Sequence, residues 1–154
     1  MPSFASPPTQ HLLRDLAAFA VHRELRPVYR LTETPKLPRR AWDFVPREGL
    51  ENLAQAVLLR LLTPRGELAA LGHPEYGSRV HELIGQENNT ARRNLLKLFI
   101  LEALKLEPRI ARVAELQVTP SPGTRSTVDV LLKVQPVGAS ELVVIGPFAI
   151  ELAV

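Results

Sequence analysis

The feature that most constrains the fold is a change of hydrophobic periodicity at Pro108. Before it, residues 49–62 and 90–106 repeat apolar side chains at helical spacing, and Pro108 stops the second of these helices. After it, residues 113–119 and 127–135 alternate apolar and polar side chains at strand spacing. A helical block followed by a strand block predicts the α+β class, with two long helices packed on a C-terminal antiparallel sheet of about three strands.

The third strand of this predicted sheet differs from the other two. Residues 142–152 are apolar almost throughout and bend at Gly146-Pro147, so the alternation is poor. The connecting segments PSPGTRS and PVGAS are short and rich in turn residues, as in antiparallel neighbours. A strand of this kind needs cover on both faces, or it lies at an edge that is open to a partner strand.

The part of the chain before residue 49 is rich in proline. Residues 1–10 contain a Pro-Pro pair and indicate a disordered arm or one ordered by a partner, and residues 12–24 fit either a helix or a strand. Residues 26–46 combine prolines with β-forming residues, which indicates short extended pieces and turns. We therefore predict an extended, proline-rich N-terminal segment over 1–48 and one α+β domain over 49–154.

Composition excludes several classes of protein. The 154 residues, 45% of them apolar, suffice for a buried core, and the absence of cysteine excludes disulfides and thiolate metal sites. No Gly-rich phosphate loop or serine-nucleophile elbow occurs, and we predict no cofactor and no metal. No signal peptide or membrane span is expected, so we predict a cytoplasmic product that is later packed into a particle.

Two other kinds of site have weak support. Basic clusters at Lys36, Arg39-Arg40 and Arg92-Arg93 are dispersed on a chain of net charge +3 with few aromatic residues, so we expect no nucleic-acid binding. Four acids are candidates for glycoside hydrolysis, but none stands in a catalytic motif: Glu67, Glu75, Glu82 and Glu87. His73 and His81 lack the partners of a zinc site.

The tripeptide Glu107-Pro108-Arg109 lies where the second helix gives way to the first strand. Its simplest interpretation is a helix terminator. In the functional interpretation, proline fixes the backbone angle and holds the flanking side chains as a rigid corner. We expect Arg109 to be exposed, to offer its five donors to a partner, and to be replaceable by alanine without loss of folding.

Three segments in order carry a resemblance to a known family. They are LLRLLTPRGEL (58–68), GHPEYGSRVHELIG (72–85) and Glu107-Pro108-Arg109. Together with the helices and strands around them, over about residues 49–135, they resemble the sheath-initiator family of contractile tails. That family includes W-like baseplate proteins of contractile phages, the "lysozyme-like" subunit of type VI secretion baseplates, and relatives in extracellular contractile injection systems.

The resemblance implies an assembly component and not an enzyme, present in six copies per particle. Its expected partners are the baseplate wedge core proteins, the tail sheath subunit and tube- or hub-proximal baseplate proteins. Glu107, Pro108 and Arg109 would dock on the wedge core bundle. The C-terminal sheet would accept sheath arms as added strands, at an edge formed by Leu142, Val143, Val144 and Ile145.

Two alternatives stay open at this point. One is a baseplate-associated peptidoglycan hydrolase, and the other is an α+β adaptor unrelated to contractile tails. The sequence does not distinguish a phage tail from a type VI system or an extracellular injection device.

Overall fold

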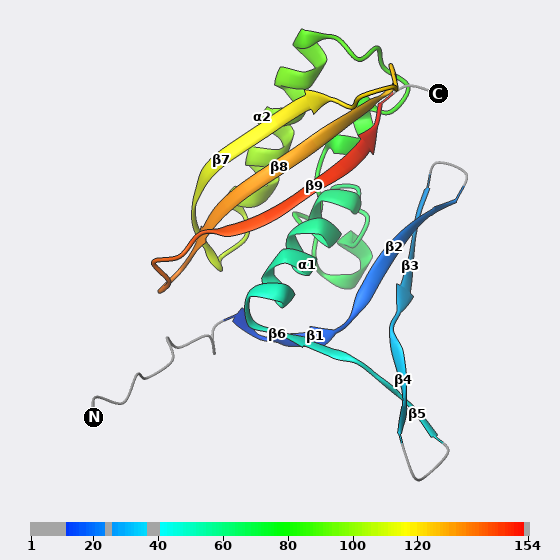
Figure 1. Cartoon of the computed structure of the whole chain (residues 1–154), viewed down its shortest axis with the longest axis vertical. Helices are drawn as coiled ribbons and strands as arrows, with labels where there is room; N and C mark the ends of the chain where they lie inside the picture. Colours follow the sequence, from blue (N-terminus) through cyan, green and yellow to red (C-terminus); the bar gives the residue numbers. More distant parts are fainter. Residues whose placement is uncertain (1–11, 24–25, 37–40, 153–154) are drawn as a thin grey trace. The chain divides into compact units, whose positions relative to one another are not determined.

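The structure is a computed structural model that describes residues 12–23, 26–36 and 41–152. Backbone contacts divide the chain into two compact units, Met1–Ala56 and Val57–Val154. Helix α1 (Gly49–Leu62) runs across the boundary between them (Figure 1). The domain boundary expected between residues 48 and 49 stays a prediction.

The first unit is built from two-stranded antiparallel ribbons. Three pairs are formed among the described residues: β1 with β6, β2 with β3, and β4 with β5. The strands are β1 (Arg14–Leu16), β2 (Ala18–Arg23), β3 (Arg26–Leu31), β4 (Glu33–Lys36), β5 (Ala41–Phe44) and β6 (Pro46–Glu48).

The three ribbons meet at a ring of backbone hydrogen bonds. Ala17 N donates to Val45 O at 2.6 Å, Val45 N to Thr32 O at 2.9 Å, and Thr32 N to Ala17 O at 2.8 Å. Each of these residues links two strands of different ribbons. The ring therefore lets the chain pass between ribbons with its backbone groups satisfied.

Polar side chains on the first half of α1 hold the chain next to this ring. The buried Asn52 donates to Leu12 O at 2.9 Å. Gln55 donates to Leu16 O at 2.8 Å and accepts from Ala18 N at 2.9 Å. Side chains of the helix thus pair with backbone groups near the ring, one of them buried and two partly buried.

The predicted fold is wrong in its first third. Strands dominate the chain, and the segment expected to be extended and proline-rich forms β1 to β6. Its prolines are compatible with strands because a two-stranded ribbon has only edge strands, where a missing N–H can face away from the partner. Pro27, Pro35 and Pro46 all lie within strand pairs. The arm expected at residues 1–10 lies outside the described residues.

The second unit contains the C-terminal sheet. Its strands are antiparallel in the order β7-β8-β9, so β7 and β9 are the edges. Its elements after α1 are the short helices η2 (Ala69–Leu71) and η3 (Val80–Leu83), helix α2 (Thr90–Lys105), and strands β7 (Ile110–Pro120), β8 (Thr127–Pro136) and β9 (Val143–Glu151).

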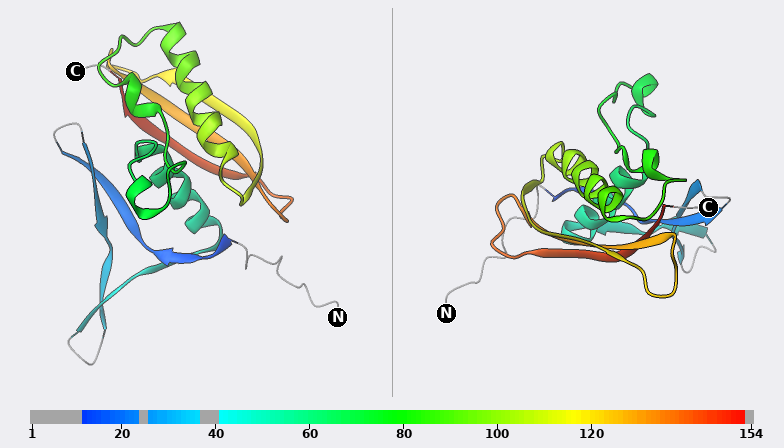
Figure 2. Two further views of the ribbon diagram at one scale, coloured as in Figure 1. Left: turned by 180° about the vertical axis from the view of Figure 1, so that it is seen from behind. Right: turned by 90° about the horizontal axis from the view of Figure 1, so that it is seen from above.

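Helix α2 covers one face of this sheet (Figure 2). It begins at Asn89, whose side chain accepts from Arg92 N at 2.9 Å as an N-cap. The residues that alternate inward on β8 are fully buried: Val128, Val130, Leu132 and Val134. The opposite face carries the ion pair between Glu115 and Lys133, and its central residues are only partly buried. The sheet is therefore one-sided, with a core against α2 and an open face.

A loop over residues 63–79 returns to the end of α1. Pro64 and Ser78 form a parallel bridge, in which Ser78 N donates to Thr63 O and Arg65 N donates to Ser78 O, both at 2.8 Å. The Ser78 hydroxyl also donates to Leu61 O at 2.6 Å. These bonds fix where the loop crosses the helix end.

We expect Gly77→Ala to destabilise the second unit strongly. Gly77 has a φ of +102°, and an added Cβ would lie 2.6 Å from the carbonyl oxygens of Thr63 and Pro64. Gly72→Ala is the matched control, because Gly72 also has a positive φ but open space around it. The control should lose about 1 kcal/mol of unfolding free energy in urea titrations, and Gly77→Ala roughly 3 kcal/mol. Equal losses would mean that the close approach at Gly77 is unimportant.

Candidate functional site

Backbone hydrogen bonds on both sides hold the corner at residues 107–109. Glu107 N donates to Leu104 O at 3.1 Å, so the last turn of α2 continues into the corner. Ile110 N donates to Glu107 O at 3.1 Å, and Val137 N donates to Arg109 O at 2.9 Å. The corner is therefore fixed both to the helix and to the start of β7 (Figure 1).

Glu107 is buried between two arginines. It is 4% exposed. Its Oε1 accepts from Arg109 Nε at 2.6 Å, and its Oε2 accepts from Arg109 Nη2 at 3.1 Å and from Arg60 Nη2 at 3.4 Å. Arg109 thus binds both carboxylate oxygens with its planar fork, the strong geometry for such a pair.

The pKa of Glu107 lies below its ordinary value. Burial acts to raise it, but the hydrogen bonds and positive charge of Arg109, with the charge of Arg60, outweigh burial. Glu107 therefore stays ionised at neutral pH and anchors both guanidinium groups.

Pro108 is the exposed residue of the three, whereas the expectation that Arg109 is exposed is wrong. The Arg109 side chain is 17% exposed and is held by Glu107. Pro108 and part of Arg109 are therefore accessible at the surface. Glu107 is buried and holds the Arg109 side chain in place.

The sequence analysis missed Arg60. This residue of α1 is 8% exposed, and its guanidinium carbon lies 4.5 Å from the centroid of the Tyr76 ring. Its position in the sequence predicts that it is buried: Arg60 falls three residues after Val57 and seven after Leu53, on the apolar stripe of the helix. A charged residue on such a stripe predicts a buried partner.

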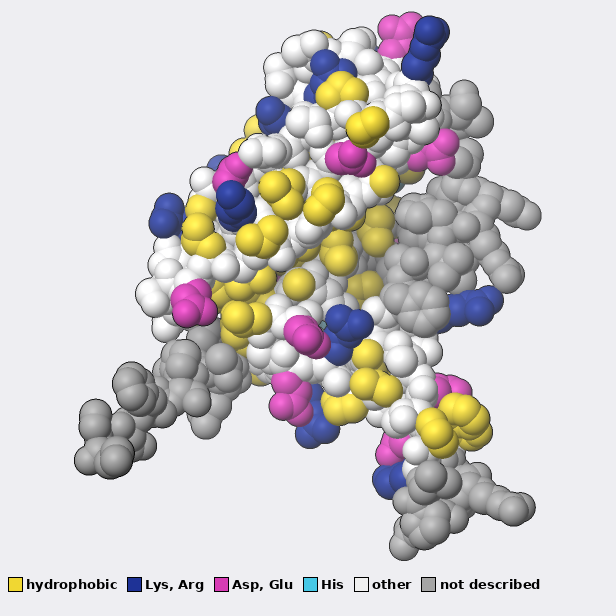
Figure 3. Space-filling view, in the orientation of Figure 1, with side chains coloured by type: hydrophobic (Ala, Val, Ile, Leu, Met, Phe, Trp, Pro, Cys, Tyr) yellow, Lys and Arg dark blue, Asp and Glu magenta, His cyan; other side chains and the backbone are white. Residues whose placement is uncertain are grey.

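The predicted edge segment falls at the start of β9, and Leu142 lies just before that strand. Val143 and Ile145 are buried, whereas Val144 is 55% exposed. The space-filling view shows hydrophobic side chains gathered on the face of the sheet turned away from α2 (Figure 3). The pairing with β8 is irregular between Ile145 and Phe148, so the first part of β9 forms a separate short edge.

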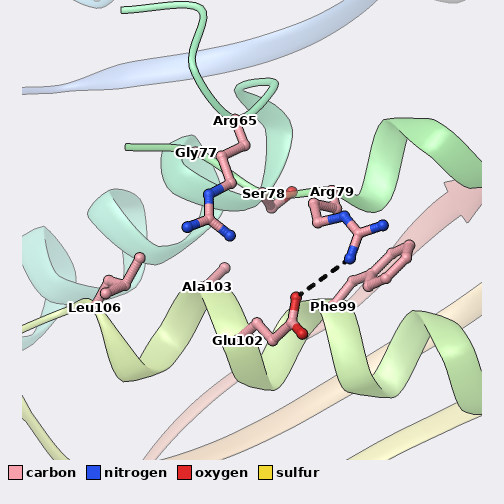
Figure 4. A pocket seen from close by; sticks show the side chains of 8 residues that line it. All are labelled: Arg65, Gly77, Ser78, Arg79, Phe99, Glu102, Ala103 and Leu106. Atoms are coloured by element: carbon pink, nitrogen blue, oxygen red, sulfur yellow. Dashed lines mark ion pairs between the residues drawn. The ribbon is translucent and has the colours of Figure 1, made fainter. Parts of the chain in front are cut away.

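A small hollow lies between the loop and α2 (Figure 4). Arg79 stacks on Phe99 at 4.2 Å from the ring centroid, pairs with Glu82 through two hydrogen bonds of 2.9 Å, and lies 3.9 Å from Glu102. The hollow has about 190 Å³ of empty space, part of it open solvent. Its charged residues are in ion pairs: Arg79 pairs with Glu82 and Glu102, and Arg65 pairs with Glu75 outside the hollow.

The acids considered for glycoside hydrolysis are exposed: Glu67, Glu75, Glu82 and Glu87. Glu75 pairs with Arg65, and the hydrogen bond from Arg79 lowers the pKa of Glu82. A glycosidase general acid needs a raised pKa, so Glu82 does not fit that role. His73 and His81 are also exposed, and the described residues contain no group of three metal-ligating side chains.

No helix in the described part of the chain is long and apolar enough to cross a membrane.

The chain is similar in fold to a solved structure from Geobacter sulfurreducens named as a candidate tail lysozyme. The identity is 23% and the TM-score 0.53, with 66% of this chain and 89% of that chain covered. No curated protein matches the sequence. The family model described as "Contractile injection system sheath initiator" matches residues 32–135, more than half of the chain. The chain therefore belongs to the sheath-initiator family of contractile injection systems, whose members are structural components of contractile-tail baseplates.

Proposed function

We propose that the chain starts the first ring of the tail sheath by accepting an extended arm of a sheath subunit as an added strand on β9. The observation that carries this proposal is that β9 is an edge strand of a one-sided sheet and that Val144, in this strand, has an exposed side chain. In such pairing, main-chain hydrogen bonds supply affinity and alternate side chains set the register.

The other edge, β7, is less suitable for a partner strand. It carries exposed polar side chains such as Arg112 and Gln117, and its pairing with β8 is irregular at two places. Charges and bulges are the features that protect a sheet edge from pairing with another chain. The start of β9 is apolar instead, with Val144 facing solvent.

Pro147 limits where an arm can pair on β9. Proline has no N–H, and an added Cβ at the adjacent Gly146 would lie 2.5 Å from Val130 O. The backbone there is committed to a close approach to β8. The proposed pairing segment is therefore residues 143–145, with Leu142 directly before it.

The corner at residues 107–109 is the proposed contact with the wedge core proteins. The support is its rigidity: the backbone is bonded on both sides, and Glu107 fixes the plane of the Arg109 fork. Pro108 would contribute direct contact, and the accessible part of Arg109 would donate to a partner oxygen. Contact with tube- or hub-proximal proteins and a count of six copies per particle remain predictions from the family resemblance.

The proposal is tested by adding the purified chain to baseplates assembled without it. Sheath should not extend on the incomplete baseplates, and the added chain should restore extension, as counted by electron microscopy. Sheath that extends equally well without the chain would remove the proposed role.

We also propose that the chain has no hydrolase activity, although its structural neighbour carries the word lysozyme in its name. The purified protein should not clear a suspension of peptidoglycan in a turbidity assay. Reproducible clearing that disappears in Glu67→Gln, Glu75→Gln or Glu82→Gln would establish the enzyme interpretation instead.

A further inference from the structure

Arg60 is a buried cation whose charge the core does not need for packing. Its side chain is 10% exposed, and its Nε has no hydrogen-bond partner. A buried donor without a partner is unfavourable, and an apolar side chain of similar size often serves a core better than a buried ion pair. The presence of an arginine here therefore points to a role other than stability.

The contacts of Arg60 connect three segments of the second unit. It lies on α1, its guanidinium group stacks on Tyr76 of the loop, and its Nη2 donates to Glu107 of the corner. The loop is bonded to the end of α1 through the Ser78 hydroxyl, which donates to Leu61 O at 2.6 Å. Within the loop, Gly66 N donates to Tyr76 O at 3.2 Å. The Arg60 guanidinium group is therefore held between α1, the Tyr76 loop and Glu107.

Glu107 connects Arg60 to Arg109. Oε2 of Glu107 accepts from both arginines, at 3.4 Å from Arg60 and 3.1 Å from Arg109. The contact with Arg60 opposes rotation of the carboxylate, and the carboxylate sets the plane of the Arg109 fork through two bonds. Arg60 can thus influence the orientation of the Arg109 side chain through Glu107.

We infer that Arg60 is a positioning residue for the docking corner, fixing Arg109 through Glu107 for a carboxylate or carbonyl oxygen of the wedge core. This inference rests on the proposed docking function of the corner. It adds that the partner's affinity depends on α1 and the Tyr76 loop as well as on the tripeptide.

The test compares binding of four variants to the purified wedge core proteins of the same particle: Arg60→Met, Arg60→Lys, Arg109→Ala and the double variant Arg60→Met/Arg109→Ala. Arg60→Met should stay folded, because Glu107 keeps both bonds to Arg109, and it should bind at least about tenfold more weakly. Arg60→Lys keeps a charged donor and should recover part of the affinity. Arg65→Met is the control, since Arg65 pairs with Glu75 outside the corner, and it should bind normally.

The double variant separates positioning from a general structural effect. If Arg60 acts through Arg109, the double variant should bind no more weakly than Arg109→Ala alone, whereas independent effects would multiply. Because Arg109→Ala removes two donors from the buried Glu107, folding is checked by circular dichroism before binding is measured. Pro108→Asp replaces Arg109→Ala if that variant is unfolded, and Tyr76→Leu replaces Arg60→Met in the same way.

Failure of this inference can be told apart from failure of the docking proposal. Normal binding of Arg109→Ala and Pro108→Asp would overturn the docking proposal, and the role of Arg60 with it. Weak binding of these variants together with normal binding of Arg60→Met would overturn the role of Arg60 alone. Multiplied losses in the double variant would have the same consequence.

Discussion

Val144→Pro should stop sheath assembly while baseplates still incorporate the chain. Proline removes a backbone donor, and added-strand pairing depends on backbone donors more than on side chains. Val144 lies in the short apolar part of β9, and its side chain is exposed, so the substitution removes no core packing. Sheath length on assembled baseplates should fall from full extension to none, and a pull-down should show unchanged binding to the wedge core proteins.

A matched substitution identifies the cause of that loss. Val144→Thr keeps the N–H and the β-branched shape, so sheath should extend normally. Thermal melts of both variants show whether β9 remains paired with β8. Normal sheath on Val144→Pro baseplates would contradict the edge model, and joint loss of sheath and wedge binding through unfolding would remove this support for it.

Glu107→Ala should cost about 3–5 kcal/mol of unfolding free energy. The substitution leaves Arg60 buried without its anion and removes the group that holds Arg109. Removing one partner of a buried ion pair costs this much because the remaining charge stays uncompensated. Glu115→Ala is the control, since its pair with Lys133 is about one-third exposed and should contribute at most about 1 kcal/mol. Urea titrations measure both, and a loss for Glu107→Ala no larger than that of the control would show that the buried arginines do not need the Glu107 charge as compensation.

Glu107 should also make the stability of the protein depend on pH in the acid range. The pKa of Glu107 is lowered in the folded state, so the folded state binds its proton less readily than the unfolded chain. Its contribution is present above the ordinary pKa of glutamate and is lost as the pH falls through the lowered value. Glu107→Gln should therefore show a shallower loss of stability at acid pH than the unchanged chain, and an identical pH profile would contradict this.

The two helices and the C-terminal strands lie where periodicity placed them. Residues 49–62 form α1, the second helix ends at Lys105 before Pro108, and β7 and β8 follow. In each case a single side-chain period extends over many residues, and a proline or cap marks the end. Local sequence is enough for elements of this kind.

The ribbons of the first unit could not be predicted in the same way. Strands of three to six residues give too short a pattern, and their junction is a ring of backbone bonds at Ala17, Thr32 and Val45. Backbone groups are the same in every residue, so the ring leaves no trace in side-chain chemistry. The prolines, which fit edge strands, suggested an extended arm instead.

The candidate site was found only in part for a related reason. The tripeptide at 107–109 is continuous in sequence and could be recognised, whereas Arg60 lies 47 residues before Glu107. Pairing over that distance depends on how α1 and the corner pack. The same packing buries most of Arg109, which local sequence suggested would be exposed.

The most direct test of sheath initiation at β9 is site-specific crosslinking. The chain has no cysteine, so Val144→Cys introduces a single thiol on the exposed face of the proposed edge. Thr119→Cys places a single thiol in β7, also at an exposed position, as the control. Side chains directly opposite on paired strands lie about 5 Å apart, within reach of a short thiol-to-amine crosslinker. In assembled tails, Val144→Cys should crosslink to an arm of the sheath subunit and Thr119→Cys should not; crosslinks from Thr119→Cys alone, or from neither position, would contradict sheath initiation at β9.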